Sequence, residues 1–361
     1  MRIGILTFHW AANYGAVLQA WALKETLAGL GHEVRVVDYV PAGFLSVCVE
    51  HARRLVKVGL PMEVSALLRN RKLRIFRKRR LALTGKYRSS RGLRERAPDC
   101  EAFICGSDQV WNAWFAERGE GEPTFSYFLD FAPAGSRKIS YAASFGASEY
   151  PDGLKREIAP LLRRFHRLSA RETDGARILD AMGFPRALVV PDPVLLMGAE
   201  GLRALLREKR PGRARAGGVF FFMLHEGQKA ILNLYEAARN EGAVPVTCNL
   251  RARIARQGLE EWLETISGSD LVVTNSYHCI ACAVLLHRKF LAVPVEGAGS
   301  GMNNRLRTLV ETYDLESRVA RGDGFAEIRR GLSSEIDWSL VDKELQINRL
   351  AGMSFLEEAL A

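Results

Sequence analysis

His278 stands in a polar cluster that interrupts apolar sequence. In the stretch VVTNSYHCIACAVLLHRKF (residues 272–290), Asn275 and Ser276 come just before the histidine. If the preceding apolar residues form a strand and the following ones a helix, the amide, hydroxyl and imidazole meet the N–H groups of a helix start. Such a turn suits an anionic ligand, and histidine is the side chain that changes charge near neutral pH. The alternative is a histidine that fills the core.

Two cysteines, Cys279 and Cys282, follow the histidine at C-x-x-C spacing. A zinc site needs four ligands, usually with a second matching pair, and the other cysteines are isolated at positions 48, 100, 105 and 248. Residue 283 is alanine, which excludes haem attachment through C-x-x-C-H. A thioredoxin-like pair is an alternative, but the apolar neighbours favour two small buried side chains.

The stretch GSDQVWN (residues 106–112) follows an expected strand that begins at residue 102. Asp108 could accept a proton from a sugar hydroxyl as a general base, or it could cap the next helix. Trp111 could stack on a sugar face or fill the core. Gly106, Ser107 and Gln109 are candidate ligand contacts at the same strand end.

A second candidate anion site is the stretch ANYGA, which contributes Asn13, Tyr14 and Gly15 just before an expected helix. The sequence has no G-x-G-x-x-G after its first strand and no G-x-x-x-x-G-K-[ST] motif, which argues against dinucleotide and P-loop sites. Gly15 still places N–H groups near a helix start, where anions bind. The alternative is a tight strand-to-helix turn that needs glycine.

Two further polar residues end expected strands. Ser144 closes the stretch RKISYAASFG (137–146), and Arg171 follows LSA. Arginine grips carboxylate or phosphate through two parallel hydrogen bonds. The alternative for Arg171 is a surface pair with its neighbour Glu172.

The elements that must position these residues alternate between strand and helix. Expected strands lie at 2–8, 33–39, 137–146, 218–224, 243–249, 271–276 and 289–295. One more strand within 102–112 runs into a Gly-Ser-Asp turn, and another within 187–196 is stopped by Asp192-Pro193. Helical patterns such as 17–31, 229–242, 259–270 and 278–287 lie between the strands. This order predicts parallel sheets, and ligands of such sheets bind beyond the carboxyl ends of the strands. The fold class expected is α/β, with two Rossmann-like domains and a cleft between them.

The expected domains are residues 1–206, with a basic helical segment at 50–96, and residues 216–325. The charged, glycine-containing stretch 207–217 reads as a linker, and the helical tail 335–361 is expected to pack back on the first domain. The first domain would be the acceptor side and the second the donor side.

Net charge is concentrated in one segment. Residues 69–96 hold 13 Lys and Arg and one acid, so this segment carries a net charge of +12. The whole chain carries +10, so the rest of the chain carries −2. This segment could be a solvated face, a contact with an anionic membrane surface or a lipid-linked phosphate, or a nucleic-acid contact. Its two aromatic residues, Phe76 and Tyr87, are few for a single-strand binder. We expect no nucleic-acid partner, and the oligomeric state stays open.

Neither a signal peptide nor a membrane span is expected. The apolar run in MRIGILTFHW is too short for a signal peptide, and no stretch reaches about 18 apolar residues. Six irregularly spaced cysteines fit a reducing compartment. The expected location is the cytoplasm, with peripheral contact at the inner membrane face as one option.

Seven stretches together resemble the polysaccharide pyruvyl transferase family. In chain order they are GILTFHWAANYGAVLQAWAL, DCEAFICGSDQVWN, KISYAASFG, LSARETDGARILDAMG, VVPDPVLL, DLVVTNSYHCIACAVLLHRKFLAVP and NNRLRTLVETYDLESRV. They extend over residues 3–319. The resemblance implies a glycosyltransferase-B-like fold and pyruvyl transfer from phosphoenolpyruvate to sugar hydroxyls in exopolysaccharide biosynthesis, with no metal or organic cofactor.

The resemblance also implies roles for individual residues. His278, Asn275, Ser276 and Arg171 would hold phosphoenolpyruvate, together with Arg305 and Asn303 of the stretch NNRLRTL. His278 would protonate the methylene carbon, and Asp108 would accept the proton of the acceptor hydroxyl. The acceptor would be a sugar of a polysaccharide or of its lipid- or nucleotide-linked precursor.

One residue departs from the family pattern, and two other functions compete. A small residue, commonly glycine, follows the motif histidine, whereas this chain has Cys279. A nucleotide-sugar glycosyltransferase of the same fold would need an acidic residue for the ribose, and Glu296 is the candidate. A membrane-surface binding protein would use residues 69–96.

Overall fold

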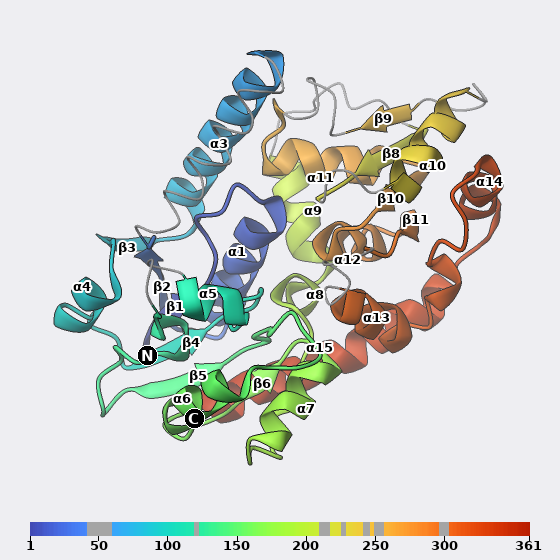
Figure 1. The fold of residues 1–361 in the computed structure, drawn as a ribbon. Helices are drawn as coiled ribbons and strands as arrows, with labels where there is room; N and C mark the ends of the chain where they lie inside the picture. Colours follow the sequence, from blue (N-terminus) through green and yellow to red (C-terminus); the bar gives the residue numbers. More distant parts are fainter. Residues whose placement is uncertain are drawn as a thin grey trace. The chain divides into compact units, whose positions relative to one another are not determined.

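The computed structural model describes residues 1–41, 60–118, 123–208, 217–224, 229–240, 246–248, 256–295 and 303–361. The predicted candidate Glu296, the start of the basic segment at 50–59 and most of the predicted linker lie outside these residues. The chain divides into two compact units, each with its own parallel sheet (Figure 1). Unit 1 comprises Met1–Gly59, Arg74–Met197 and Asn348–Ala361, and unit 2 comprises Leu60–Leu73 and Gly198–Ile347.

Unit 1 is built on a five-stranded parallel sheet of order β3-β2-β1-β4-β5. Its strands are β1 (Arg2–Leu6), β2 (Glu33–Tyr39), β3 (Leu83–Tyr87), β4 (Ala102–Cys105) and β5 (Arg137–Ser140). The central strand β1 is apolar and fully buried from Ile3 to Leu6, as expected for a sheet covered on both faces. A short parallel pair, β6 (Ser169–Ala170) and β7 (Leu188–Val189), follows β5, and an isolated bridge joins Ala143 to Ala170.

The helices of unit 1 connect these strands. They are α1 (Tyr14–Gly29), α4 (Ser90–Glu95), α5 (Ala113–Arg118), α6 (Asp152–Leu162), α7 (Thr173–Ala181) and α8 (Pro193–Met197). The strand predicted within 187–196 ends before Asp192, as expected, because Asp192 turns the chain into α8. Its Oδ1 accepts a hydrogen bond from the N–H of Val194 at 2.9 Å.

Unit 2 contains a four-stranded parallel sheet of order β11-β10-β8-β9. The strands are β8 (Val219–Phe222), β9 (Val246–Cys248), β10 (Leu271–Thr274) and β11 (Lys289–Ala292), and the helices are α9 (Ala199–Glu208), α10 (Lys229–Asn240), α11 (Leu259–Gly268), α12 (Tyr277–Leu285), α13 (Asn303–Thr312) and α14 (Phe325–Ser333). Gly331 lets α14 lie close to the sheet, since a Cβ there would come within 2.9 Å of Leu291.

The passage from unit 1 to unit 2 falls at Met197, before the predicted end of the first domain at residue 206. Helix α9 belongs to unit 2 because it packs on α11. The two long helices α3 (Leu60–Arg80) and α15 (Trp338–Leu360) have residues in both units.

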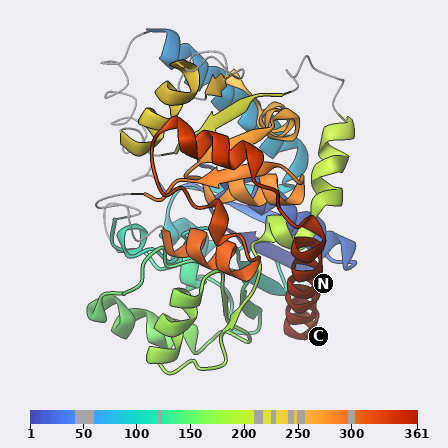
Figure 2. The ribbon, with the colours of Figure 1, turned by 90° about the vertical axis from the view of Figure 1, so that its right-hand side faces the viewer.

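The last residues of α15 pack on unit 1 (Figure 2). Phe355 is buried beside the ring of Tyr141, and Arg167 pairs with Glu358 at 2.6 Å.

No described helix is long and apolar enough to cross a membrane.

Candidate active site

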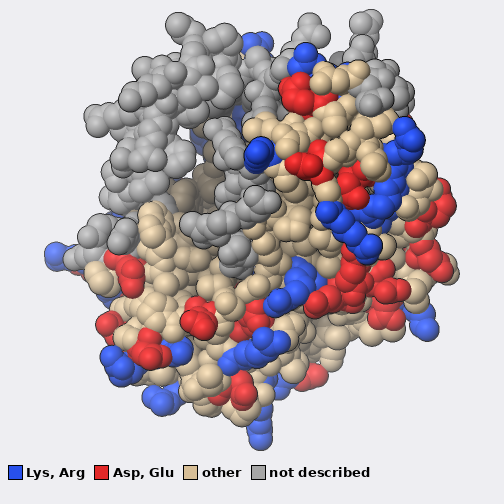
Figure 3. Space-filling view, turned by 45° about the vertical axis from the view of Figure 1, so that its right-hand side comes forward, with Lys and Arg blue, Asp and Glu red and all other residues tan. Residues whose placement is uncertain are grey.

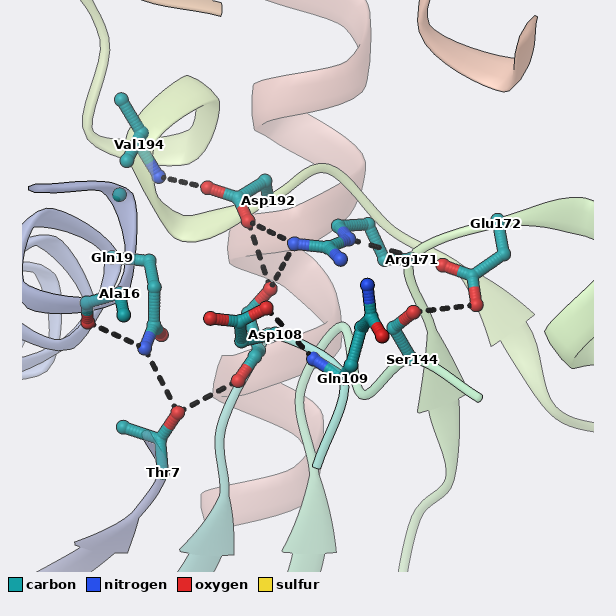
Figure 4. A network of polar contacts seen from close by, with 12 residues as sticks. Thr7, Ala16, Gln19, Asp108, Gln109, Ser144, Arg171, Glu172, Asp192 and Val194 are labelled. Atoms are coloured by element: carbon teal, nitrogen blue, oxygen red, sulfur yellow. Dashed lines mark hydrogen bonds and ion pairs between the residues drawn. The ribbon is translucent and has the colours of Figure 1, made fainter. Parts of the chain in front are cut away.

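Polar residues from successive strand ends of unit 1 form one buried network (Figure 4). Thr7, just after β1, donates to the carbonyl oxygen of Ser107, just after β4, at 2.7 Å. The Ser107 hydroxyl donates to Asp192 Oδ2 at 2.8 Å. Gln19 of α1 joins the network by donating to Thr7 Oγ1 at 2.8 Å. The carboxyl ends of parallel strands therefore meet here, as such sheets require.

Arg171 lies between two carboxylates in this network. Its Nη1 is 3.1 Å from Asp192 Oδ2, and its Nε is 3.8 Å from Glu172 Oε2. All three side chains are at most 1% exposed. The alternative of a surface pair with Glu172 is therefore wrong, because the pair is buried. The two carboxylates more than offset the single guanidinium charge, so we assign Arg171 a positioning role.

Ser144 has a similar positioning role. Its hydroxyl donates to Glu172 Oε1 at 2.8 Å and accepts from the N–H of Gly146 at 3.1 Å. Glu172 thereby fixes the loop after β5, since Oε1 also accepts from the N–H of Phe145.

Asp108 lies beside this network with its side chain partly exposed. Its φ of 78° is left-handed, a conformation that aspartate tolerates better than most residues. Its Oδ1 accepts from the N–H of Gln109 at 2.8 Å. The predicted alternative of a helix cap is wrong, because Asn112 caps α5 by accepting from the N–H of Trp114.

The residues around Asp108 have structural roles: one allows the backbone to pass close to another strand, and one fills the core. Gly106 is required where the chain passes β1, since a Cβ would lie 3.0 Å from Thr7 Cβ. Gln109 is partly buried, and its Oε1 accepts from Asn112 at 3.3 Å. Trp111 fills the core, the second of its two predicted alternatives: it is fully buried and stacks on Phe128, with ring centroids 5.4 Å apart.

The predicted anion site at residues 13–15 is the first turn of α1. Asn13 caps this helix, with Oδ1 accepting from the N–H of Gly15 at 2.8 Å. Tyr14 and Gly15 are buried. The helix therefore begins at Tyr14, earlier than the predicted residue 17.

The sequence reasoning missed a buried pair beside this turn. His9 is 1% exposed, and its Nε2 lies 3.1 Å from Asp38 Oδ1. Burial raises the pKa of Asp38, but the hydrogen bond and charge of His9, with Lys86 and Arg77, lower it overall. His9 follows a buried apolar strand, and this position was the available signal in the sequence. Its partner Asp38 is 29 residues away, so the sequence did not point to the pair.

In unit 2, His278 occupies the first turn of α12, directly after β10. Ser276 caps the helix and accepts from the N–H of Cys279 at 3.4 Å. Asn275 Oδ1 accepts from the N–H of Leu224, just after β8, at 2.9 Å. The imidazole is 5% exposed and meets the ring of Tyr277 edge-on. The structure thus brings the three predicted residues to one strand-to-helix turn.

The two thiols lie behind this turn. Cys279 and Cys282 are both fully buried in α12. Burial raises the pKa of the Cys279 thiol well above its ordinary value, although a hydrogen bond with Thr274 opposes the rise. Within the described part of the chain, no three His, Cys, Asp or Glu side chains gather as metal ligands. The thiols therefore read as small core residues.

Helix α13 contributes the last two predicted contacts. Both ends of the Asn303 amide bond to the backbone of Val295, each at 2.8 Å. Both polar groups of the Asn303 side chain are therefore hydrogen-bonded within unit 2. Arg305 is half-buried in the first turn of the same helix.

One protein-family model matches most of this chain. The family model described as polysaccharide pyruvyl transferase matches residues 13–297. A search of curated proteins found no match.

Solved structures share the fold at low sequence identity. The UGT89C1 protein of Arabidopsis thaliana, complexed with UDP, is 10% identical, with 100% of each chain covered and a TM-score of 0.51. The UDP-GlcNAc 2-epimerase of Neisseria meningitidis, bound to UDP-GlcNAc, is 11% identical, with 100% of this chain and 99% of that chain covered and a TM-score of 0.50. These matches confirm the α/β fold with two Rossmann-like domains, like that of glycosyltransferase-B proteins. Since the family model covers most of its length, the chain belongs to the polysaccharide pyruvyl transferase family.

Proposed function

We propose that this transferase moves the pyruvyl group of phosphoenolpyruvate to one or two hydroxyls of a sugar. The sugar would belong to a bacterial-type surface polysaccharide or to its lipid- or nucleotide-linked precursor. The observation that carries the proposal is the turn after β10, which lies inside the family match and holds Asn275, Ser276 and His278 together. Neither a metal ion nor an organic cofactor enters the proposed reaction.

Phosphoenolpyruvate carries a phosphate and a carboxylate, and the turn after β10 offers groups that bind anions. The first turn of α12 contains no acidic residue, and its N–H groups and dipole favour an anion. Arg305, in the first turn of α13, is the cation we assign to the donor. We leave Arg171 out of this role because Asp192 and Glu172 already balance its charge.

The proposed reaction balances without any further reactant. A proton from the His278 imidazolium goes to C3 of phosphoenolpyruvate, which becomes a methyl group and leaves C2 electrophilic. The acceptor hydroxyl adds to C2 and gives its proton to Asp108, and the C2–O bond to phosphate breaks. A second hydroxyl then closes the ketal, and its proton leaves with inorganic phosphate. Asp108 releases its proton to water and His278 takes one up, which restores both groups for the next turnover.

His278→Gln tests the assignment of the acid. A general acid contributes about 10²–10⁴ in rate, so we expect phosphate release to fall by at least about 100-fold, with the melting temperature nearly unchanged. His287→Gln is the matched control, because His287 is a partly exposed histidine of the same unit that stacks on Trp338. Near-normal turnover of His278→Gln, or an equal loss in the control, would contradict the role.

A ligand screen separates pyruvyl transfer from transfer of a nucleotide-linked sugar. We expect phosphoenolpyruvate to raise the melting temperature of the protein, because only the folded state binds it. A UDP-sugar can serve as the nucleotide-linked acceptor of the proposed reaction as well as the donor of a glycosyltransferase, so its effect alone does not separate the two functions. Stabilisation by UDP-sugars without any stabilisation by phosphoenolpyruvate would favour a glycosyltransferase.

A further inference from the structure

Helix α3 has one face that anchors it to unit 1. Leu73 and Phe76 are buried, and the ring of Phe76 meets that of Trp21 edge-on. Arg77 donates to the carbonyl oxygens of His9 and Trp10. This face is therefore fixed by apolar packing and by hydrogen bonds.

The opposite face of α3 is cationic. Arg71, Arg74, Lys78 and Arg79 are exposed, and at 3.6 residues per turn they lie on the side away from Leu73. Their side chains form no ion pair or hydrogen bond with any residue that the structure describes. By contrast, basic and acidic side chains alternate on the face that Figure 3 shows.

Aliphatic side chains lie among these cations. Leu67 is 68% exposed and Ile75 is 40% exposed. Both fall on the same side of the helix as Arg71 and Lys78 by helical spacing. Clustered cations with a few exposed aliphatic side chains between them suit contact with an anionic lipid surface, which attracts basic segments.

We propose that this face of α3, formed by Leu67, Arg71, Arg74, Ile75, Lys78 and Arg79, docks on an anionic phospholipid bilayer. The cations would contact lipid phosphates, and the two aliphatic side chains would enter the boundary between headgroups and acyl chains. A nucleic acid fits less well, because this face offers no aromatic side chain for base stacking. The docking does not rest on pyruvyl transfer and is measured without substrate.

Co-sedimentation of the full chain with vesicles tests this docking. We expect binding to vesicles of equal parts phosphatidylcholine and phosphatidylglycerol, and none to phosphatidylcholine alone. Each basic residue near an anionic surface contributes about fivefold to binding, so the triple variant R74Q/K78Q/R79Q should bind about 100-fold more weakly. Salt at about 1 M, where the Debye length is about 3 Å, should release the protein.

The control variant carries the same charge change elsewhere on unit 1. Arg156, Arg163 and Arg186 are exposed, and R156Q/R163Q/R186Q should bind within about threefold of the unchanged protein if the α3 face is the contact. Ile75→Gln should weaken binding without altering charge. Equal weakening by both triple variants, unchanged binding of Ile75→Gln, binding to neutral vesicles, or tighter binding to duplex DNA at the same salt would each overturn the proposal.

Discussion

Charge balance at single residues decides what the strand-end groups can do. Arg171 faces Asp192 and Glu172 in a buried setting, so its guanidinium stabilises the fold. Asp108 follows Ser107 in the chain, and its side chain is partly exposed beside this network. The proposed chemistry therefore depends on Asp108 and His278, and the buried ions hold the frame around the first of them.

Replacing Arg171 with alanine should destabilise the protein strongly. Removal of one partner of a buried ion pair costs about 3–5 kcal/mol, because the remaining charge is left uncompensated. Arg91→Ala is the control: Arg91 pairs with Glu95, and the two side chains are 84% and 55% exposed, so its loss should change the free energy of unfolding only slightly. Urea unfolding of both variants measures the difference. Equal free energies of unfolding would contradict the buried role of Arg171.

Asp38→Asn should reduce stability at neutral pH and little at acid pH. The pKa of Asp38 is lower in the folded state than its ordinary value, so its stabilisation is present above about pH 4 and is lost as pH falls through the folded pKa. A hydrogen bond to a charged group contributes about 1.5–3 kcal/mol. Urea titrations of both proteins across this range measure the gap. A gap that stays constant with pH would contradict a stabilising role for the ionised Asp38 carboxylate beside His9.

At the scale of elements, local chain chemistry sets where each helix begins. Asn13, Ser276 and Asn112 each accept a hydrogen bond from a backbone N–H in the first turn that follows. Each lies where a strand or loop turns into a helix, and two of them, Asn13 and Ser276, are also candidate ligand contacts. Capping and ligand binding therefore compete as explanations for the same residue.

Variants of Asn13 separate these explanations. Asn13→Ala removes the cap of α1 and should lower the free energy of unfolding by about 1 kcal/mol, whereas Asn13→Ser should restore most of it. If the side chain also contacts the acceptor, Asn13→Ser will restore stability but leave the KM for the acceptor raised. Thermal unfolding and steady-state kinetics of the two variants provide both values. Full recovery of KM in Asn13→Ser would limit the residue to capping.

Long apolar runs made most elements predictable. Strand β2 matches its predicted bounds, 33–39, and α12 is buried along its whole length, as its composition indicated. Strand β3 was missed because LTGKY contains a glycine and a lysine and is only partly buried at the sheet edge. The sequence pointed to Glu172 as a neighbour of Arg171, but not to Ser107 and Asp192, which lie 64 and 21 residues away and are brought to Arg171 only by the fold.

At the scale of the whole molecule, the family match shows a transferase, and the two parallel sheets belong to a glycosyltransferase-B-like fold. Each of the two units carries its own strand-end candidates: Asp108 in one, His278 in the other. The central claim is that a solvent-derived proton reaches C3 of phosphoenolpyruvate during transfer.

Turnover in D₂O tests this claim most directly. The unchanged protein would be incubated with phosphoenolpyruvate and a panel of lipid- and nucleotide-linked sugars, and the product analysed by mass spectrometry. We expect a product with the mass of the acceptor plus pyruvate less water, with deuterium in its new methyl group and inorganic phosphate released in equal amount. A product without deuterium in that methyl group, or transfer of a sugar from a nucleotide donor in its place, would contradict it.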